Sequence, residues 1–217
     1  MLNWWRQVFS MRISLLASVF TACSIAALHA GERIELMGTV IRYDGNVAYA
    51  DGDDAFSQDA NAIRELVRGN PNISKIVLVG DFPMTGLAIE VARVIEDFGL
   101  ATEIDKECTN ACLYMFASGN PRVLGDGARI GLRRRVVDAA LLKKVYPKDA
   151  QRFGWADESG QAAMMYDRGQ SDMRWALLHL VQHGIALDFA LKIFATPRED
   201  MWWPTRGELV AGGVTLE

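Results

Sequence analysis

Two pairs of side chains in this sequence have the clearest potential for chemistry. Cys108 and Cys112 flank the segment TNA, and His179 and His183 lie four residues apart in a stretch with helical periodicity. Thiols and imidazoles act as nucleophiles, as bases and as metal ligands. The sequence therefore offers a redox pair, a disulfide, a metal site or a nucleophile with its base.

The spacing of the cysteines narrows these alternatives. A redox-active pair has two intervening residues, whereas three lie between Cys108 and Cys112, which disfavours oxidoreductase activity. A Cys₂His₂ metal site is also disfavoured because no zinc module surrounds either pair, and we expect no metal and no cofactor. Two interpretations remain open. The cysteines form a disulfide if their Cα atoms come within about 7 Å, or they are reduced and fill space under a helix.

The elements around these residues alternate between strand and helix. Residues 34–52 predict a hairpin around Asp44-Gly45-Asn46, and the stretch at residues 53–72 predicts a helix that is stopped at Gly69-Asn70-Pro71. Residues 74–81 form a continuous apolar run, typical of a strand that is covered on both faces. Residues 85–100 predict an amphipathic helix that ends at Gly99.

The remainder continues the pattern and then becomes helical. We expect a strand at residues 101–105, a turn at Cys108 that leads into a helix ending near Ser118, and two short strands around residues 125–127. Helices are predicted over residues 172–184, 186–197 and 206–211. Alternating strands and helices favour an α/β sheet with helices outside it.

The order of these motifs resembles the Clp protease/crotonase superfamily, and most closely its secreted bacterial Clp-like branch. Four stretches carry the resemblance: KIVLVGD…TGLAIEVARVIEDFGLAT, CTNACLYMFASGNPRVLGDGARIGL, HGIALDFALKIFATPREDMWWPT and ELVAGGVT. The resemblance implies a stacked β-β-α superhelical core with C-terminal helices, and it implies homo-oligomers.

Active members of that superfamily have a serine within Cys-x-Ser-x-Cys, a histidine base and a glycine-rich oxyanion turn. Here Asn110 occupies the serine position and Arg133 occupies the histidine position. Asn110 is not a useful nucleophile, and the pKa of an arginine is too high for a base. The glycine-rich turn is reduced to Gly80, followed by Asp81 and, two residues later, Pro83. We therefore expect that serine-peptidase activity has been lost.

The leading hypothesis is a binding or scaffolding protein for an unknown peptide or protein. The resemblance places its ligand site at Gly80, Asp81, Asn110 and Arg133. Asn110 would hold a ligand carbonyl or carboxylate, or it would be only a helix N-cap. Arg133 would clamp an anion, or it would lie at a solvated strand end or in an oligomer contact.

Two other hypotheses are kept. The first is an active hydrolase with Thr109 or Cys112 as its nucleophile and His179 or His183 as its base. The second is an acyl-binding crotonase-like protein, which would rely on backbone N–H groups rather than on a serine.

The first 30 residues predict a secretory signal, with an uncharged apolar stretch after Arg12. Met11 is an alternative start, and a retained anchor or a lipoprotein lipidated at Cys23 is the alternative to cleavage. We expect residues 31–217 to form one domain that is secreted across the inner membrane into the periplasm. Contact with a membrane is expected only through the N-terminal segment, if that segment stays uncleaved. Cleavage removes Arg6 and Arg12 and leaves 21 basic against 27 acidic side chains, a net charge of −6. Such a charge argues against nucleic acid as a partner.

Overall fold

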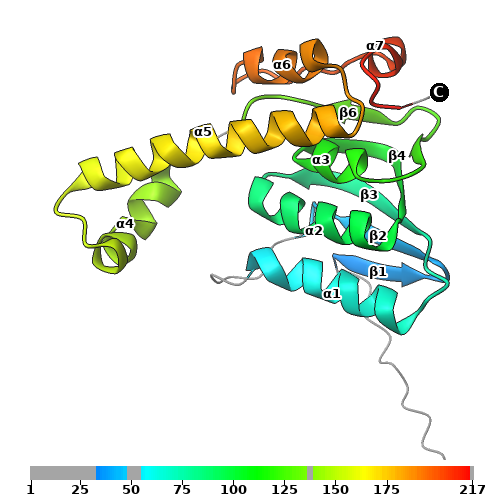
Figure 1. The fold of residues 1–217 in the computed structure, drawn as a ribbon, viewed down its shortest axis with the longest axis horizontal. Coiled ribbons are helices and arrows are strands. Elements are labelled where there is room, and N and C mark those ends of the chain that lie inside the picture. The colour runs from blue at the N-terminus through cyan, green and yellow to red at the C-terminus, as the bar shows by residue number, and fades with distance from the viewer. Residues whose placement is uncertain (1–32, 48–54, 136–138, 216–217) are drawn as a thin grey trace, which may run out of the picture.

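The computed structural model describes residues 33–47, 55–135 and 139–215 (Figure 1). The predicted signal segment lies outside the described residues. The elements in chain order are β1 (Ile34–Met37), β2 (Val40–Asp44), α1 (Ala55–Gly69), β3 (Lys75–Phe82), α2 (Thr85–Phe98), β4 (Ala101–Asn110), α3 (Cys112–Ala117), β5 (Arg122–Leu124), β6 (Arg129–Gly131), α4 (Ala139–Phe153), α5 (Glu158–Gln182), α6 (Leu187–Ala195) and α7 (Arg206–Ala211).

The strands form one mostly parallel sheet in the order β1-β2-β3-β4-β5. β1 and β2 are antiparallel, whereas β2, β3 and β4 run parallel to one another. β5 and β6 both pair with β4, one after the other along its length. Helices α1, α2 and α3 lie along one face of this sheet (Figure 1). The predicted α/β class is confirmed.

The core lies between β3 and α2. Ile76 and Leu78 of β3 are fully buried, as are Val91 and Ile95 on the apolar stripe of α2. Burying each such side chain stabilises the fold by about 1.5–3 kcal/mol. α2 ends at Gly99 as predicted, because Gly99 adopts a φ of 62° and its N–H caps the last turn.

The predicted hairpin turn was placed wrongly. β1 and β2 are joined at Gly38 and Thr39, where Gly38 supplies a φ of 65°. Gly45 instead ends β2 where the chain passes against β3, and a side chain at Gly45 would collide with the backbone of Asp81. The glycine was therefore a signal of close backbone approach rather than of a hairpin.

β4 is longer than predicted. It continues through Cys108 to Asn110, because a register shift after Leu78 accommodates the polar residues 105–107 before pairing with β3 resumes. The predicted turn at Cys108 is therefore wrong. A bulged strand interrupts the pattern of alternating polarity that sequence interpretation relies on.

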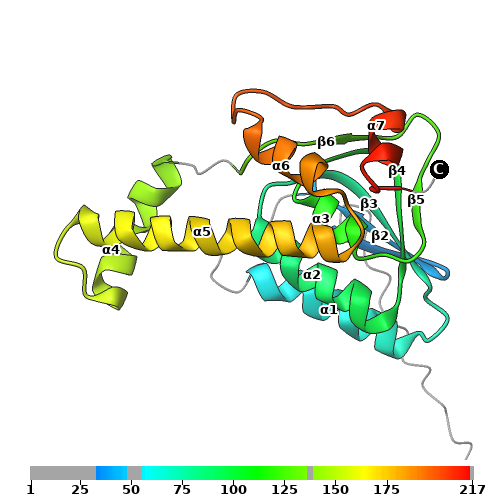
Figure 2. The ribbon, with the colours of Figure 1, turned by 45° about the horizontal axis from the view of Figure 1, so that its top comes forward.

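α5 is the longest helix described, and it begins well before the predicted residue 172. Its C-terminal half packs against α3, while its N-terminal half projects from the sheet together with α4 (Figures 1 and 2). Asp157 caps the start of α5 by accepting a hydrogen bond from the backbone N–H of Ser159 at 2.9 Å. Within the described ranges, no helix is long and apolar enough to cross a bilayer.

Candidate functional site

Asn110 lies at the end of β4, where the chain turns into α3. It is the one described non-glycine residue with a positive φ, 59°, a conformation that asparagine tolerates better than most residues. Its side-chain amide donates to Asp81 Oδ1, and its Oδ1 accepts a hydrogen bond from Arg133 Nε at 3.1 Å. The N-cap interpretation of Asn110 is wrong, because Ala111 precedes the helix and the Asn110 side chain turns toward β3.

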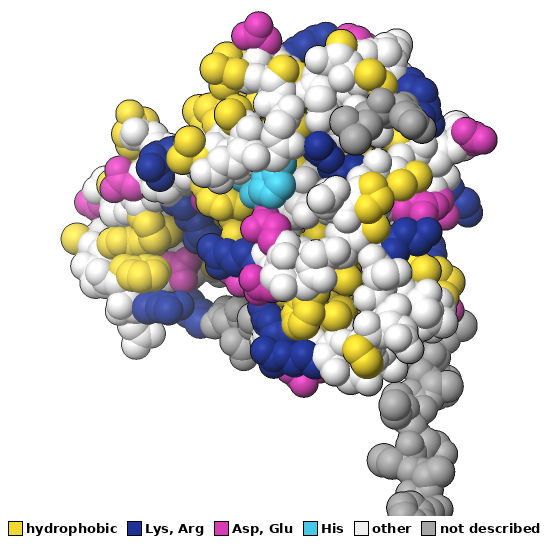
Figure 3. Space-filling view, turned by 45° about the vertical axis from the view of Figure 1, so that its right-hand side comes forward, with side chains coloured by type: hydrophobic (Ala, Val, Ile, Leu, Met, Phe, Trp, Pro, Cys, Tyr) yellow, Lys and Arg dark blue, Asp and Glu magenta, His cyan; other side chains and the backbone are white. Residues whose placement is uncertain are grey.

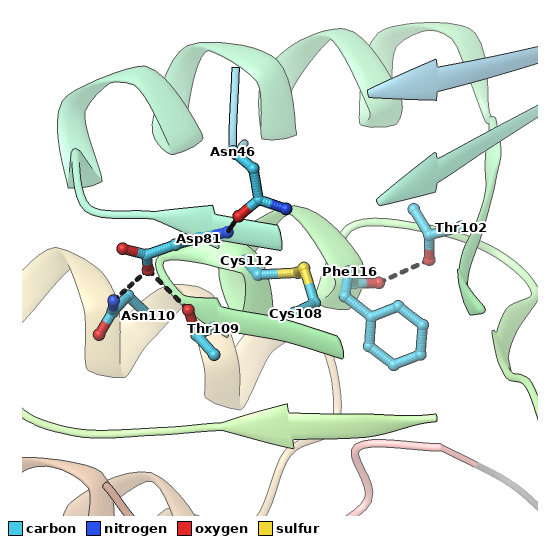
Figure 4. The surroundings of a disulfide bond; sticks show 8 residues. All are labelled: Asn46, Asp81, Thr102, Cys108, Thr109, Asn110, Cys112 and Phe116. Carbon is cyan, nitrogen blue, oxygen red and sulfur yellow. Dashed lines mark hydrogen bonds between the residues drawn. A yellow bond between two sulfur atoms is a disulfide. The ribbon is translucent and has the colours of Figure 1, made fainter. Parts of the chain in front are cut away.

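Asp81 is the centre of this network. Its Oδ1 also accepts a hydrogen bond from the Thr109 hydroxyl at 2.6 Å, and its backbone N–H donates to the side-chain oxygen of Asn46 at 3.2 Å (Figure 4). Gly80 has a φ of 92° and packs directly against Asn46. The stretch that resembles an oxyanion turn is thus part of β3, and the Asp81 N–H is already engaged.

Cys108 and Cys112 form a disulfide between β4 and α3, with Cα atoms 5.9 Å apart (Figure 4). Both residues are fully buried. Cys112 is therefore not available as a nucleophile, which corrects that part of the hydrolase hypothesis. Thr109, the other alternative nucleophile, donates its hydroxyl hydrogen to Asp81.

The two histidines lie in a different cluster, where α5 meets α2 and the end of α3. His179 Nε2 is 2.9 Å from the Tyr114 carbonyl oxygen and 3.3 Å from Ser118 Oγ. His183 Nδ1 is 2.7 Å from the His179 carbonyl oxygen. In the part of the chain that the structure describes, neither imidazole forms a hydrogen bond with Thr109. The structure therefore does not assemble the predicted nucleophile and base.

Burial shifts the pKa values of two residues at the contact between α3 and α5, His179 and Tyr114. It lowers the pKa of His179, an effect that the hydrogen bond to the Tyr114 carbonyl opposes and that nearby His183 reinforces. Burial also raises the pKa of the Tyr114 hydroxyl to about 12, with a smaller contribution from the carboxylate of Asp172. His179 is therefore favoured as a neutral imidazole and Tyr114 as a neutral phenol.

Two adjoining cavities lie between the Asn110 network and α5. The first is small, about 60 Å³, and is lined by Asn110, Arg133 and residues of α3. The second, about 260 Å³, shares part of that lining and extends along α5. Its charged residues are Arg133, Arg134, Arg135, Arg168 and Asp172, and its apolar residues include Met165, Met173, Ala176 and Phe194. Gly80 and Asp81, predicted as ligand contacts, are not among the lining residues of either cavity.

Sequence interpretation missed the contribution of α5 to this cleft and the partners of the histidines. Met165 and Arg168 lie in the N-terminal half of α5, for which no helix was predicted. Glu96 and Ser118 meet the histidines only through the packing of α2 and α3 on α5. No local pattern marks either residue. An i,i+4 histidine pair was the only signal present.

No family model matches the chain, and no characterised protein matches it in sequence. Among solved structures it is similar to ThnE from S. clavuligerus, with 10% identity, a TM-score of 0.46, and coverage of 85% of this chain and 74% of that one. An enoyl-CoA hydratase/isomerase from Cupriavidus metallidurans CH34 gives 12% identity, a TM-score of 0.47, and coverage of 88% and 69%. Likeness at these levels says nothing about what the chain binds or catalyses.

Proposed function

We propose that this protein is a ligand-binding domain of the Clp/crotonase type that lacks serine-peptidase chemistry. The observation that carries the proposal is the network of Asp81, Asn110 and Arg133. By the resemblance to Clp-like proteins, these side chains would occupy the positions of the oxyanion turn, the nucleophile and the base, and they are hydrogen-bonded to one another. None of them supplies an activated nucleophile at neutral pH.

The cleft beside this network suits an anionic group joined to an apolar body. Four arginines and one aspartate line the larger cavity, although the whole chain carries a net charge of −4. The aspartate, Asp172, is paired with Arg135, and Arg133 donates to Asn110 and to the Arg198 carbonyl oxygen. Arg134 and Arg168 are then the guanidinium groups that would form bidentate hydrogen bonds with a ligand carboxylate. The methionines and Phe194 supply the apolar contact.

We propose a peptide segment with a free C-terminal or side-chain carboxylate as the ligand. A fatty acyl carboxylate has similar chemistry and is the second candidate, since the same apolar and cationic walls favour it. The disulfide supports export to an oxidising compartment such as the periplasm, where such bonds persist. Homo-oligomerisation remains part of the proposal.

The loss of peptidase chemistry is tested with a fluorophosphonate probe, which labels activated serines. The purified protein is expected to remain unlabelled under conditions in which a serine hydrolase is labelled completely. The double substitution Asn110→Ser and Arg133→His is also expected to stay unlabelled, because the Asp81 N–H still donates to Asn46. Stoichiometric labelling of the natural protein would contradict the proposal.

Ligand binding is tested by titration with fluorescent apolar peptides that end in a carboxylate or in an amide, and with a fluorescent fatty acid. The carboxylate peptide is expected to bind more tightly than the amide, and the substitution Arg168→Gln is expected to weaken it about tenfold. Arg68→Gln, an exposed arginine on α1, is the matched control. Equal affinity for the carboxylate and amide peptides would exclude the cleft as a carboxylate site, whereas preference for the fatty acid would favour the acyl-binding alternative.

A further inference from the structure

A second cluster of polar side chains lies away from the Asn110 network, where α2, α3 and α5 meet. It consists of Glu96 near the end of α2 and His179 and His183 at the end of α5. Glu96 Oε1 is 3.3 Å from His183 Nε2 and 3.8 Å from His179 Nδ1, and all three atoms lie within 4.8 Å of one another. Histidine atoms reach the surface beside acidic side chains (Figure 3).

The hydrogen-bond partners assign the tautomers of both imidazoles. His179 Nε2 faces the Tyr114 carbonyl oxygen, which only accepts, so this nitrogen carries the hydrogen. His183 Nδ1 faces the His179 carbonyl oxygen and carries the hydrogen for the same reason. In the neutral rings, the lone pairs are then on His179 Nδ1 and His183 Nε2, the two atoms nearest to Glu96 Oε1.

Glu96 is held in place by a hydrogen bond from Ser118, whose hydroxyl oxygen is also 3.3 Å from His179 Nε2. The Ser118 hydroxyl donates to Glu96 Oε1 at 2.8 Å from the end of α3. Two imidazole lone pairs and one carboxylate oxygen therefore converge with no hydrogen among them. We propose that Glu96, His179 and His183 bind a divalent metal ion of the zinc class.

The geometry suits such an ion. Ligand atoms about 2.0–2.2 Å from a tetrahedral zinc are separated from one another by about 3.4 Å. The 3.3 Å separation between Glu96 Oε1 and His183 Nε2 matches this value, and the His179 imidazole, at 3.8 Å from Glu96 Oε1, would move closer on binding. Each histidine donates its other N–H to a backbone carbonyl, as metal-bound histidines commonly do. A carboxylate with two imidazoles also favours zinc or a neighbouring transition metal over Mg²⁺ and Ca²⁺, which prefer oxygen ligands.

The three ligands leave a coordination position open. Glu96 and both histidines line a cavity of about 220 Å³, which also includes Arg93 and Arg174. Three protein ligands with a water in the fourth position are typical of zinc sites that are not purely structural. The site differs from the Cys₂His₂ set considered for the sequence, because both cysteines are in the disulfide.

The proposal is tested by calorimetric titration of the metal-free, tag-free full chain with Zn²⁺. We expect one ion per chain with a dissociation constant in the micromolar range or tighter, unaffected by millimolar Mg²⁺. Glu96→Gln and His183→Gln are each expected to weaken binding at least about tenfold, and Ser118→Ala, which removes a positioning residue, by less. Glu90→Gln, on the same helix but ion-paired with Arg93 outside the cluster, is the matched control and should bind as the natural chain does.

Two further measurements separate loss of the site from loss of the fold. The thermal midpoint of each variant without metal should stay near that of the natural chain. Zn²⁺ should stabilise the natural chain and Glu90→Gln fully, Ser118→Ala to a smaller extent, and Glu96→Gln and His183→Gln least. Trp175 stacks on His179 with ring centroids 4.6 Å apart, so Co²⁺ binding should quench its fluorescence. Zinc binding that survives both ligand substitutions, or no binding by the natural chain, would overturn the proposal.

Discussion

The two polar clusters at the opposite ends of α3 differ in how their hydrogen-bond donors and acceptors are matched. At the start of the helix, Asp81 accepts hydrogen bonds from Thr109 and Asn110, and Asn110 accepts one from Arg133. At its far end, three acceptor atoms of Glu96 and the two histidines converge. A network whose members satisfy one another stabilises the fold, whereas converging acceptors need a cation from outside.

This difference separates stability from binding. Substitutions in the Asp81 network should change the free energy of unfolding and leave zinc binding intact. Substitutions in the Glu96 cluster should weaken zinc binding and leave the free energy of unfolding of the metal-free chain nearly unchanged.

Asp81→Ala is expected to have the largest effect on stability. It removes the acceptor for the hydroxyl of Thr109, which is buried, and for the Asn110 amide. The free energy of unfolding in urea should fall by about 2–4 kcal/mol. Asp105→Ala, on an exposed position of β4, is the matched control and should change it by less than about 0.5 kcal/mol. If the two variants are equally stable, the network does not hold the site together.

Tyr114 lies on α3, between the two clusters, and its titration should show in the pH dependence of stability. Its pKa in the folded protein is about 12, against an ordinary value of 10.0. The stabilising contribution is complete below pH 10 and is lost as the pH rises toward 12, because the unfolded chain releases this proton first. The loss amounts to about 2–3 kcal/mol.

Tyr114→Phe removes this titration and keeps the aromatic ring. The stability of the variant relative to the natural chain should therefore rise by about 2–3 kcal/mol between about pH 9 and pH 12. Tyr166→Phe is the matched control, since Tyr166 is 71% exposed, and its unfolding curve should run parallel to that of the natural chain. A parallel curve for Tyr114→Phe would mean that the phenol is solvated.

Reducing the Cys108–Cys112 disulfide should lower the free energy of unfolding by less than Asp81→Ala does. Its two cysteines are four residues apart in sequence, so the closed loop is short and the entropy it removes from the unfolded chain is small. Reduction should lower the free energy of unfolding by about 2 kcal/mol. The double variant Cys108→Ala and Cys112→Ala should show no response to reductant, and zinc binding at Glu96 should survive reduction. Loss of zinc binding on reduction would mean that the two clusters depend on each other and are not separate sites.

The sequence predicted the fold better than it predicted the site. The apolar run of β3, the stripe of α2 and the glycine that ends α2 are local signals, and the structure has all three. Asn110 and Arg133 were also predicted from the sequence to lie in one ligand site, and they are hydrogen-bonded to each other. Their partner Asp81 was selected, but its contact with Asn46 was not, because the pairing of β3 with the end of β2 depends on register.

The histidine cluster shows which contacts local sequence patterns do not predict. His179 and His183 were visible as a helical pair, but Glu96 belongs to another helix and Ser118 to the end of a third. The bulge in β4 had a similar effect, since it hid the strand that places Asn110. In both cases, the decisive contacts join residues distant in sequence, and only the packing of the elements brings them together.

The smallest effect expected concerns the backbone of Asn110. Asn110→Gly and Asn110→Ala both lose the hydrogen bonds to Asp81 and from Arg133, but only glycine accepts a φ of 59° without a steric cost. The alanine variant should therefore be less stable than the glycine variant by about 1 kcal/mol in urea unfolding. The same two substitutions at Asn72, an exposed residue whose φ is not positive, should give the opposite order. If glycine and alanine are equivalent at position 110, the left-handed turn relaxes once the side chain is removed. In that case the side-chain hydrogen bonds of Asn110, and not its backbone conformation, would account for the stability of its network. The two clusters would then differ only in how their side-chain donors and acceptors are matched.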